Sequence, residues 1–422
     1  MATTVILGAG IIGTSTAYYL SKHQPGSSIH VVEASPELFA SASGYAGGFL
    51  AKDWFGPAAA ALGALSFEEH RKLAEKEDGA RRWGYARSTS ISLAQAAGSR
   101  KGGSVDVWCR EGASRAEAAS GGGDGDGIGD ALAGVALPWL RRAEGDAVEV
   151  ISEEGTTAQV DPLELSRFLL QRCQEACVHL HHPAKALSIA ADVRGELSSI
   201  CIADTQSSSE TDVPCTNIII AAGAWSAQVF ATLFPTSTTK LPVSSLAGHS
   251  LVVKSPRWLR EHEEKLGCHS VFMTSTQPGY SPEIFSRIGG HIYIAGLNSA
   301  TEPLPALATD AKAGISQSAI ETLRDTAREV LGKGSVEDDL EIVREGLCFR
   351  PVTDRGTPIL GRIPDRCLGD GVATRTGAEG GVYLAAGHGP WGISMSLGTG
   401  KVVAEMVQGR GLSADVSMLS LR

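Results

Sequence analysis

The sequence predicts an α/β fold, α+β overall, in which two domains are interleaved along one chain. The chain begins with an apolar strand, a glycine turn and a helix, and residues 381–409 repeat that order. Another apolar strand, residues 217–223, ends in a glycine turn near the middle of the chain. The intervening strand-like runs are typical of antiparallel sheet. Because similar pieces lie at both ends and in the middle, the two domains are interleaved and not in tandem.

The composition is that of a soluble globular protein with a sizeable core. The chain has 422 residues, of which 43% are hydrophobic and 20% are charged. A formal net charge of -10 argues against nucleic acid or an anionic membrane as the main partner. The 8 cysteines show no disulfide framework, no apolar run reaches membrane-spanning length, and no secretory signal begins the chain. We therefore expect a cytoplasmic protein.

The first half of the chain contains clear element signals. Residues 3–8 predict a buried strand, residues 11–23 a helix and residues 28–34 a second strand. Asp161 can cap a helix over residues 163–177, since Pro162 suits the first helical position and Glu164 falls where a capping box has an acid. After it, residues 178–182, 184–190 and 198–204 predict a small meander.

The second half predicts an antiparallel sheet over residues 249–255, 283–288 and 290–297, then a helix over residues 315–332. These elements assign residues 1–50, 150–235 and 346–422 to a discontinuous nucleotide-binding domain. Residues 51–149 and 236–345 then form the substrate domain and its insertions. A glycine-rich block within residues 120–130 predicts a mobile surface loop near residues 100–130.

The turn after the first strand reads GAGIIG. Gly8 allows the tight turn, Gly10 lets the backbone approach a pyrophosphate, and Gly13 lets the helix pack closely on the strand. The start of the helix favours an anion. Glu33 ends the second strand, where a carboxylate can accept hydrogen bonds from an adenosine ribose. Together these features predict a dinucleotide site for NAD or FAD.

Two further stretches favour FAD. Residues 41–51, SASGYAGGFLA, combine small residues, hydroxyls and paired glycines, so main-chain amides can approach phosphates and a flat ring. Residues 384–394, LAAGHGPWGIS, end a strand in glycines and begin a helix. Amides at that helix start can stabilise negative charge at the N1/C2=O edge of a reduced flavin. A nicotinamide enzyme has no need of this last element.

These stretches resemble the FAD-dependent oxidoreductases of the D-amino acid oxidase, glycine oxidase and sarcosine oxidase family, and fungal members most. VILGAGIIGTSTAYYL, VVEAS, SASGYAGG, QVDP, IIIAAGAWS, FRPVTDRGTPILG and GHGPWGIS follow the family's order through nearly the whole chain. The resemblance implies a Rossmann-type FAD-binding domain interleaved with an antiparallel-sheet substrate domain. It implies FAD contacts from Gly8, Gly10, Ile11, Ile12, Gly13, Glu33, Ala34, Ser41, Ala42, Ser43, Gly44, Gly47, Gly48, Phe49, Ala186, Ala222, Gly223, Trp225, Gly387, Gly389, Pro390, Trp391, Gly392, Ile393 and Ser394.

The family also implies a reaction class. A small amine or amino acid delivers hydride from its C–H bond to flavin N5, the imine is hydrolysed, and O2 reoxidises the flavin to give H2O2. Sarcosine oxidases use a lysine near the flavin to activate O2, and residues 271–300 contain none. Two alternatives therefore stay open: a dehydrogenase with a non-O2 acceptor, and a flavin-binding regulatory protein without catalysis.

Arg350 stands where D-amino acid oxidase and glycine oxidase bind a substrate carboxylate, a task suited to a planar pair of donors. The alternative is a structural arginine that pairs with Asp354 or a backbone carbonyl. Pro390 and Trp391 replace the family's second cation, which suggests a more apolar or aromatic substrate. Trp391 forms one wall of the pocket or packs beneath the flavin loop, and Tyr293 is a further pocket candidate.

Cys348 stands where sarcosine oxidases attach the flavin at its C8 methyl through sulfur. The alternative is a small buried hydrophobe, the commoner role of a free cysteine. On a strand, Cys348 and Arg350 would share one face. His179, His181 and His182 lack an acid or cysteine at a helpful local spacing, so we expect no metal site.

Overall fold

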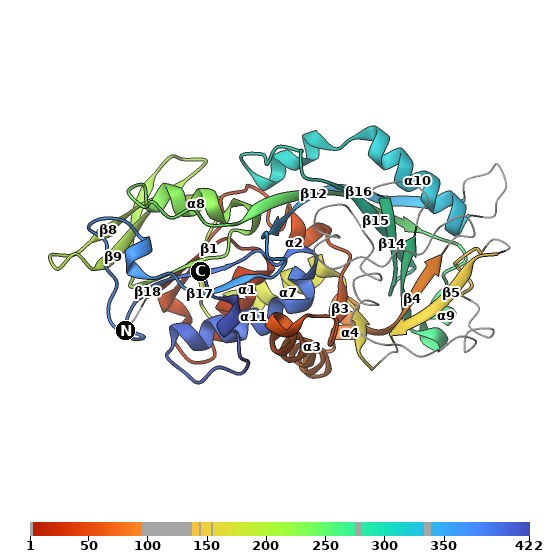
Figure 1. The fold of residues 1–422 in the computed structure, drawn as a ribbon, viewed down its shortest axis with the longest axis horizontal. Helices are drawn as coiled ribbons and strands as arrows, with labels where there is room; N and C mark the ends of the chain where they lie inside the picture. Colours follow the sequence, from red (N-terminus) through yellow and green to blue (C-terminus); the bar gives the residue numbers. More distant parts are fainter. Residues whose placement is uncertain (1–2, 95–136, 143–144, 153–154, 275–279, 333–338) are drawn as a thin grey trace.

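A computed structural model describes residues 3–94, 137–142, 145–152, 155–274, 280–332 and 339–422 (Figure 1). The loop expected near residues 100–130 lies outside these described residues. Two large sheets lie end to end along the molecule, and both chain termini lie beside the first of them (Figure 1). The predicted α/β class with a parallel and a mostly antiparallel sheet is confirmed.

The first sheet has six strands from distant parts of the sequence, in the order β17-β18-β11-β1-β2-β7. Its strands are parallel except that β17 runs antiparallel to β18. Apolar runs such as TVIL in β1 suit a parallel sheet that is covered on both faces. The six strands are β1 (Thr4–Leu7), β2 (Ile29–Val32), β7 (His179–His181), β11 (Asn217–Ile220), β17 (Ile359–Arg362) and β18 (Gly381–Ala386).

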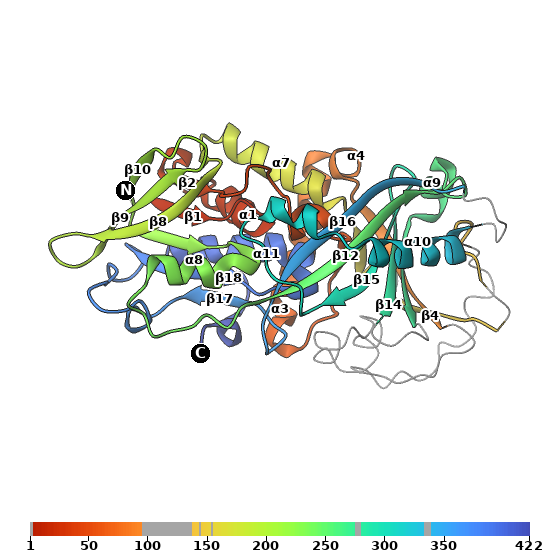
Figure 2. The ribbon, with the colours of Figure 1, turned by 90° about the horizontal axis from the view of Figure 1, so that it is seen from above.

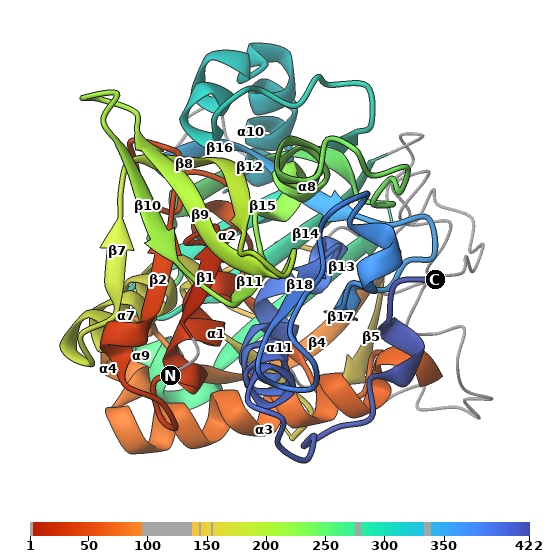
Figure 3. The same cartoon turned by 90° about the vertical axis from the view of Figure 1, so that its left-hand side faces the viewer.

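Helices cover one face of this sheet. Ile6 and Ile219 on that face belong to a core that includes residues of α1, α3, α7 and α11. The opposite face carries Val5 and Ile218, which pack with α8 and with a three-stranded sheet of order β10-β9-β8 (Figure 3). The elements are α1 (Ile11–Leu20), α3 (Pro57–Glu77), α7 (Pro162–Glu175), α8 (Ser226–Leu233), α11 (Gly392–Val407), β8 (Ala184–Ala191), β9 (Leu197–Asp204) and β10 (Glu210–Pro214).

The second large sheet has nine strands, in the order β16-β12-β15-β14-β13-β4-β6-β3, with β5 paired to β4. Its strand pairs are antiparallel except for β13 with β4. Helix α10 (Gln317–Leu331) packs on this sheet (Figure 2). The strands are β3 (Phe49–Ala51), β4 (Ala86–Ala94), β5 (Ala147–Ser152), β6 (Thr157–Gln159), β12 (Ser244–Lys254), β13 (Cys268–Thr274), β14 (Tyr280–Arg287), β15 (His291–Ser299) and β16 (Glu341–Val352), and the short helices are α2 (Ala42–Tyr45), α4 (Gly79–Trp83) and α9 (Arg260–Leu266).

Several local predictions are confirmed. Asp161 caps α7, because its Oδ1 accepts hydrogen bonds from the amides of Leu163 (2.9 Å) and Glu164 (3.1 Å). The strands and helices expected in the second half are present as β12, β14, β15, β18, α10 and α11. Every described cysteine is free.

The predicted meander is wrong in its first strand. β7 does not pair with β8, but lies parallel to β2 at the edge of the six-stranded sheet. The reason is the helix before it: a strand that follows a helix can return to lie parallel to an earlier strand. Only β8, β9 and β10 form the small antiparallel sheet. The division of the chain into domains at the expected boundaries stays a prediction.

Candidate functional site

One cavity of about 470 Å³ is lined by residues from both large sheets. It extends from the glycine turn after β1 to Tyr293 of β15 and Cys348 and Arg350 of β16. Many residues predicted to bind cofactor or substrate meet there. They are Gly8, Gly10, Ile11, Ile12, Glu33, Ala34, Ser41, Ala42, Ser43, Gly47, Gly48, Phe49, Ala186, Ala222, Gly223, Trp225, Tyr293, Cys348, Arg350, Gly389, Pro390, Gly392 and Ile393.

Five predicted residues lie outside the cavity lining: Trp391, described below, and four that support the lining, Gly13, Gly44, Gly387 and Ser394. A methyl group at Gly13 would overlap the carbonyl oxygen of Gly8, which confirms the expected close packing of helix on strand. A methyl group at Gly44 would overlap a backbone carbonyl, and Gly387 has a left-handed φ of +83°. The Ser394 hydroxyl is buried and accepts a hydrogen bond from the amide of Ala51 (3.0 Å). These residues shape the backbone that the cavity uses.

The β1 end of the cavity has the geometry of a dinucleotide turn. Gly8 has a φ of +107°, and a methyl group there would lie 2.5 Å from the carbonyl oxygen of Ala221. Glu33 spans the turn: Oε2 accepts from the amide of Ala9 (3.0 Å) and Oε1 from the amide of Ser35 (2.9 Å). The carboxylate is therefore fixed at the position where ribose hydroxyls of a nucleotide can donate to it.

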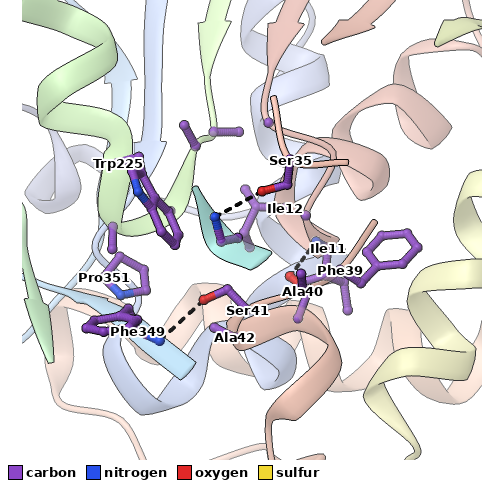
Figure 4. Close-up of a pocket in the computed structure, with 18 of the residues that line it drawn as sticks. Ile11, Ile12, Ser35, Phe39, Ala40, Ser41, Ala42, Trp225, Phe349 and Pro351 are labelled. Atoms are coloured by element: carbon purple, nitrogen blue, oxygen red, sulfur yellow. Dashed lines mark hydrogen bonds between the residues drawn. The ribbon is translucent and has the colours of Figure 1, made fainter. Parts of the chain in front are cut away.

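The loop over residues 41–49 is hydrogen-bonded to the start of helix α1 and to strand β16. The Ser43 hydroxyl accepts a hydrogen bond from the amide of Ile11 (2.9 Å), at the start of α1. The Ser41 hydroxyl accepts from the amide of Phe349 (3.3 Å), on β16 (Figure 4). The loop thus holds the β1 end and the β16 end of the cavity in one arrangement.

Sequence reasoning missed the buried groups that hold this loop from below. Arg287 of β14 donates from Nη2 to the carbonyl oxygens of Ala46 (2.7 Å) and Gly47 (2.6 Å). Gln159 adds a further hydrogen bond, from Nε2 to the Gly47 carbonyl oxygen (2.6 Å). Burial lowers the pKa of Arg287, and the nearby Asp161 carboxylate opposes that shift. Gln159 falls in QVDP, a stretch that carries the family resemblance, but no local pattern assigns this role to either residue.

A second missed group is a strap over residues 305–308. The amide of Ala308 donates to the Ser35 hydroxyl (3.0 Å), and the Trp225 indole donates to the Pro305 carbonyl oxygen (2.7 Å). Figure 4 shows Ser35 and Trp225 on opposite sides of the cavity. Ala306, Leu307 and Ala308 join the lining there. The strap therefore spans the cavity between the Glu33 side and α8.

His388, which the sequence analysis did not single out, lines the cavity beside Gly389. Its Nε2 lies 3.0 Å from the Thr399 hydroxyl inside α11, and its side chain is buried. Burial lowers the pKa of His388 to about 3, so the imidazole is neutral at physiological pH. His388 consequently adds a polar but uncharged group to the glycine turn that precedes α11.

The β16 end of the cavity brings Arg350, Cys348 and Tyr293 together. Arg350 does not pair with Asp354; its Nη1 donates to Oδ1 of Asn298. Burial lowers the pKa of Arg350, but interactions with Cys348, Tyr293 and Glu283 outweigh it and raise the pKa overall. The guanidinium is therefore a permanent cation in an otherwise apolar end of the cavity.

Three aromatic residues at this end form one stack: Tyr293 and Phe49 line the cavity, and Phe285, outside the lining, lies between them. The Phe285 ring lies parallel to Tyr293, with 5.8 Å between ring centroids, and Phe49 stacks on Phe285 at 5.7 Å. Trp391 lies outside the cavity lining, with its ring edge-on to Phe55 at 4.9 Å. Its placement matches packing beneath the loop and not a pocket wall. Tyr293 and Phe49 thus give an aromatic wall to the end of the cavity that contains Arg350.

Cys348 is buried in the cavity wall. Burial raises the pKa of its thiol, and Arg350 and Arg344 offset this shift only in part. The thiol is therefore protonated at neutral pH, whereas a flavin tether needs the thiolate as nucleophile. Cys348 and Arg350 both line the cavity, as expected for two residues on one face of a strand.

The donors around the cavity suit FAD. Gly223 has a φ of +55°, and no atom lies within 4 Å of the place that a side chain would take, so its backbone is open to a ligand. Helices α1 and α11 begin at the cavity, and the start of a helix favours an anionic group of a ligand. In the described part of the chain no helix is long and apolar enough to cross a membrane, and no cluster of acids, histidines and cysteines could hold a metal.

Known proteins share this architecture along the whole chain. A Schizosaccharomyces pombe protein named as a candidate oxidoreductase is 26% identical over 438 residues, covering 98% of this chain and 96% of that protein. Glycine oxidase from Geobacillus kaustophilus superposes with a TM-score of 0.72 at 21% identity, over 100% of this chain and 98% of that one. L-proline dehydrogenase from P. horikoshii gives a TM-score of 0.71 at 16% identity, over 99% of this chain and 96% of that one.

The two structural likenesses establish the fold. The family described as FAD dependent oxidoreductase, DAO, matches residues 3–406. That match includes the glycine turn, Glu33, the loop over residues 41–49, β16 and the start of α11. The chain belongs to the DAO family of FAD-dependent oxidoreductases.

Proposed function

We propose that this oxidoreductase acts on a C–N bond of a small amine or amino acid. One observation carries the proposal: a single cavity joins a dinucleotide turn at β1 to a buried guanidinium on β16, whose hydrogen-bond acceptor Asn298 is neutral. The first end suits the adenosine and diphosphate of FAD. The second end suits a small substrate with an anionic group, since Arg350 offers several N–H donors in one plane.

In this proposal the chain's own residues bind and orient. Glu33, the α1 amides and the loop over residues 41–49 hold the dinucleotide, and the start of α11 faces the flavin. Arg350 holds the substrate carboxylate while Tyr293 and Phe49 give an apolar surface that excludes water. The chemistry that bound FAD supplies is acceptance of hydride from the substrate carbon, after which the imine is hydrolysed and the electrons pass to O2 as H2O2.

A dehydrogenase is the second candidate. Residues 271–300 contain no lysine, so the O2-activating device of sarcosine oxidases is missing from that stretch. L-proline dehydrogenase, a solved structure of similar fold, is named for dehydrogenation. H2O2 formation under air with a substrate that turns over would support the oxidase, and turnover only with an artificial quinone acceptor would support the dehydrogenase.

The experiment that tests the proposed function is anaerobic bleaching of FAD-loaded protein. The panel contains D- and L-amino acids, N-methyl amino acids and amines without a carboxylate. We expect a carboxylate-bearing amine to bleach the flavin absorbance. Arg350→Met should lower the affinity for that substrate by about 100-fold and leave FAD binding unchanged. Arg350→Lys keeps the charge without the planar fork and serves as the matched control. A protein that stays colourless with FAD would contradict the proposal at its base.

A further inference from the structure

The Arg350 side chain crosses the neighbouring strand β12 and hydrogen-bonds to Asn298 on the strand beyond it, β15. β12 lies between β16 and β15 (Figure 2), and its Gly248 pairs with Cys348 on one side and with Asn298 on the other. The guanidinium lies against Gly248, where a methyl group would be 2.8 Å from both Nη1 and Nη2 of Arg350. On the far side of β12, Nη1 donates to Oδ1 of Asn298. A side chain at position 248 would force the guanidinium to move from this position.

The sheet is irregular next to Asn298. The register between β12 and β15 shifts between Gly248 and Ser250, and Gly296 on the partner strand has a left-handed φ of +130°. The Asn298 amide donates from Nδ2 to the Gly296 carbonyl oxygen (3.5 Å), which leaves Oδ1 for Arg350. Bulges next to active sites commonly re-aim a side chain.

The acceptor, Oδ1 of Asn298, is neutral, and it therefore leaves the positive charge of Arg350 at the β16 end of the cavity. Among the described residues Arg350 forms no ion pair by direct contact; the buried Glu283 raises its pKa without such a contact, and Tyr293 acts on it through a hydrogen bond. An amide oxygen orients the guanidinium and uses one of its N–H donors. A carboxylate at the same place would orient it equally well but would also neutralise it.

We propose that Asn298, seated across Gly248, is a positioning residue that orients the Arg350 guanidinium for a substrate carboxylate and leaves its charge available. The inference rests on the proposed function, in which Arg350 binds that carboxylate. It makes a neutral residue, outside the cavity lining, a determinant of specificity.

The test uses FAD-loaded full-length protein titrated with benzoate, and with benzamide as the neutral ligand of matched shape. The flavin absorption spectrum reports binding. Asn298→Asp keeps the shape and adds a charge, and Asn298→Leu removes the acceptor at similar volume. We expect Asn298→Asp to lower the affinity for benzoate about 100-fold and Asn298→Leu to lower it about tenfold. The affinities for benzamide and FAD should change less than about twofold.

Each outcome has a distinct meaning. If Asn298→Asp binds benzoate as the wild type does while Arg350→Met does not, Asn298 has no positioning role and the carboxylate site of Arg350 stands. If benzoate and benzamide weaken together, the variant has changed the cavity shape and the charge argument is wrong. If the wild type binds no benzoate, both the inference and the carboxylate site are wrong. Asn298→Leu carries the test alone where Asn298→Asp does not fold.

Discussion

Single glycines determine where the backbone of the cofactor site can run. Gly13 does not touch the cavity, yet a side chain there would drive α1 away from the turn at Gly8. The glycine therefore acts on FAD through the distance between helix and strand. A dinucleotide turn needs this close packing as much as it needs the glycines that face the ligand.

We predict that Gly13→Ala lowers the free energy of unfolding by about 1–3 kcal/mol, as overpacking of a tight contact does. Urea unfolding measures this loss, and FAD binding should weaken in the same variant. Gly411→Ala is the matched control, because nothing lies within 4 Å of the place that its methyl group would take. Equal stability of the two variants would show that the helix can move without cost.

Cys348 gives a second prediction at this scale. Its buried thiol has a raised pKa, so the nucleophilic thiolate is scarce near neutral pH. We expect acid precipitation of FAD-loaded protein to release all of the yellow colour into the supernatant, in wild type and Cys348→Ser alike. Colour that stays with the wild-type pellet and leaves the Cys348→Ser pellet would establish a covalent tether instead.

At the scale of elements, the carboxylate of Asp161 connects the start of α7 to the loop over residues 41–49. Asp161 caps α7 with Oδ1 and lies 3.6 Å, through Oδ2, from Nη1 of Arg287. Arg287 in turn holds the carbonyl oxygens of Ala46 and Gly47. The helix start therefore supplies the counter-charge for the buried cation that supports the loop over residues 41–49.

Two variants of Asp161 separate these roles. Asp161→Asn keeps a capping oxygen and removes the charge, whereas Asp161→Ala removes both. We expect Asp161→Ala to be less stable than Asp161→Asn by about 1 kcal/mol, the usual contribution of a cap. Urea unfolding gives this difference. Asp161→Asn should itself weaken FAD binding, and unchanged FAD affinity would mean that Arg287 holds the loop without its counter-charge.

At the scale of the whole molecule, neutral buried histidines set the acid limit of stability. Burial lowers the pKa of His70 and His269 to about 4 and that of His388 to about 3. An unfolded chain binds a proton at each histidine near pH 6.5, but the folded chain does not. Their stabilising effect is complete above about pH 6.5 and is lost as the pH falls toward the folded values.

We therefore expect the free energy of unfolding to fall between about pH 7 and about pH 5, by up to about 1.4 kcal/mol for each histidine and pH unit. Urea unfolding across this range measures the slope. His269→Asn removes one titrating group away from the cavity and should reduce the slope without changing FAD affinity. A slope that His269→Asn leaves unchanged would show that His269 takes up its proton in the folded state.

Much of the predicted FAD-binding part of the chain could be predicted from the spacing of residues close together in the sequence. The glycine turn, Glu33 and the cap at Asp161 depend on residues a few positions apart or on one strand–turn–helix unit, so their signals are complete in the sequence. β7 was misplaced because a three-residue strand carries no signal of the strand that it pairs with. Its parallel partner β2 lies far away in the chain.

The sequence by itself determined the family, the cofactor class and the positions of Arg350 and Cys348 on one strand. Only the tertiary structure decided what surrounds them. Asn298 lies 52 residues from Arg350, and the loop carbonyl of Gly47 lies 240 residues from Arg287. Such partners are chosen by strand register and by a bulge, and neither leaves a local pattern. The charge left on Arg350 is consequently a property of the folded sheet and not of the motif that contains it.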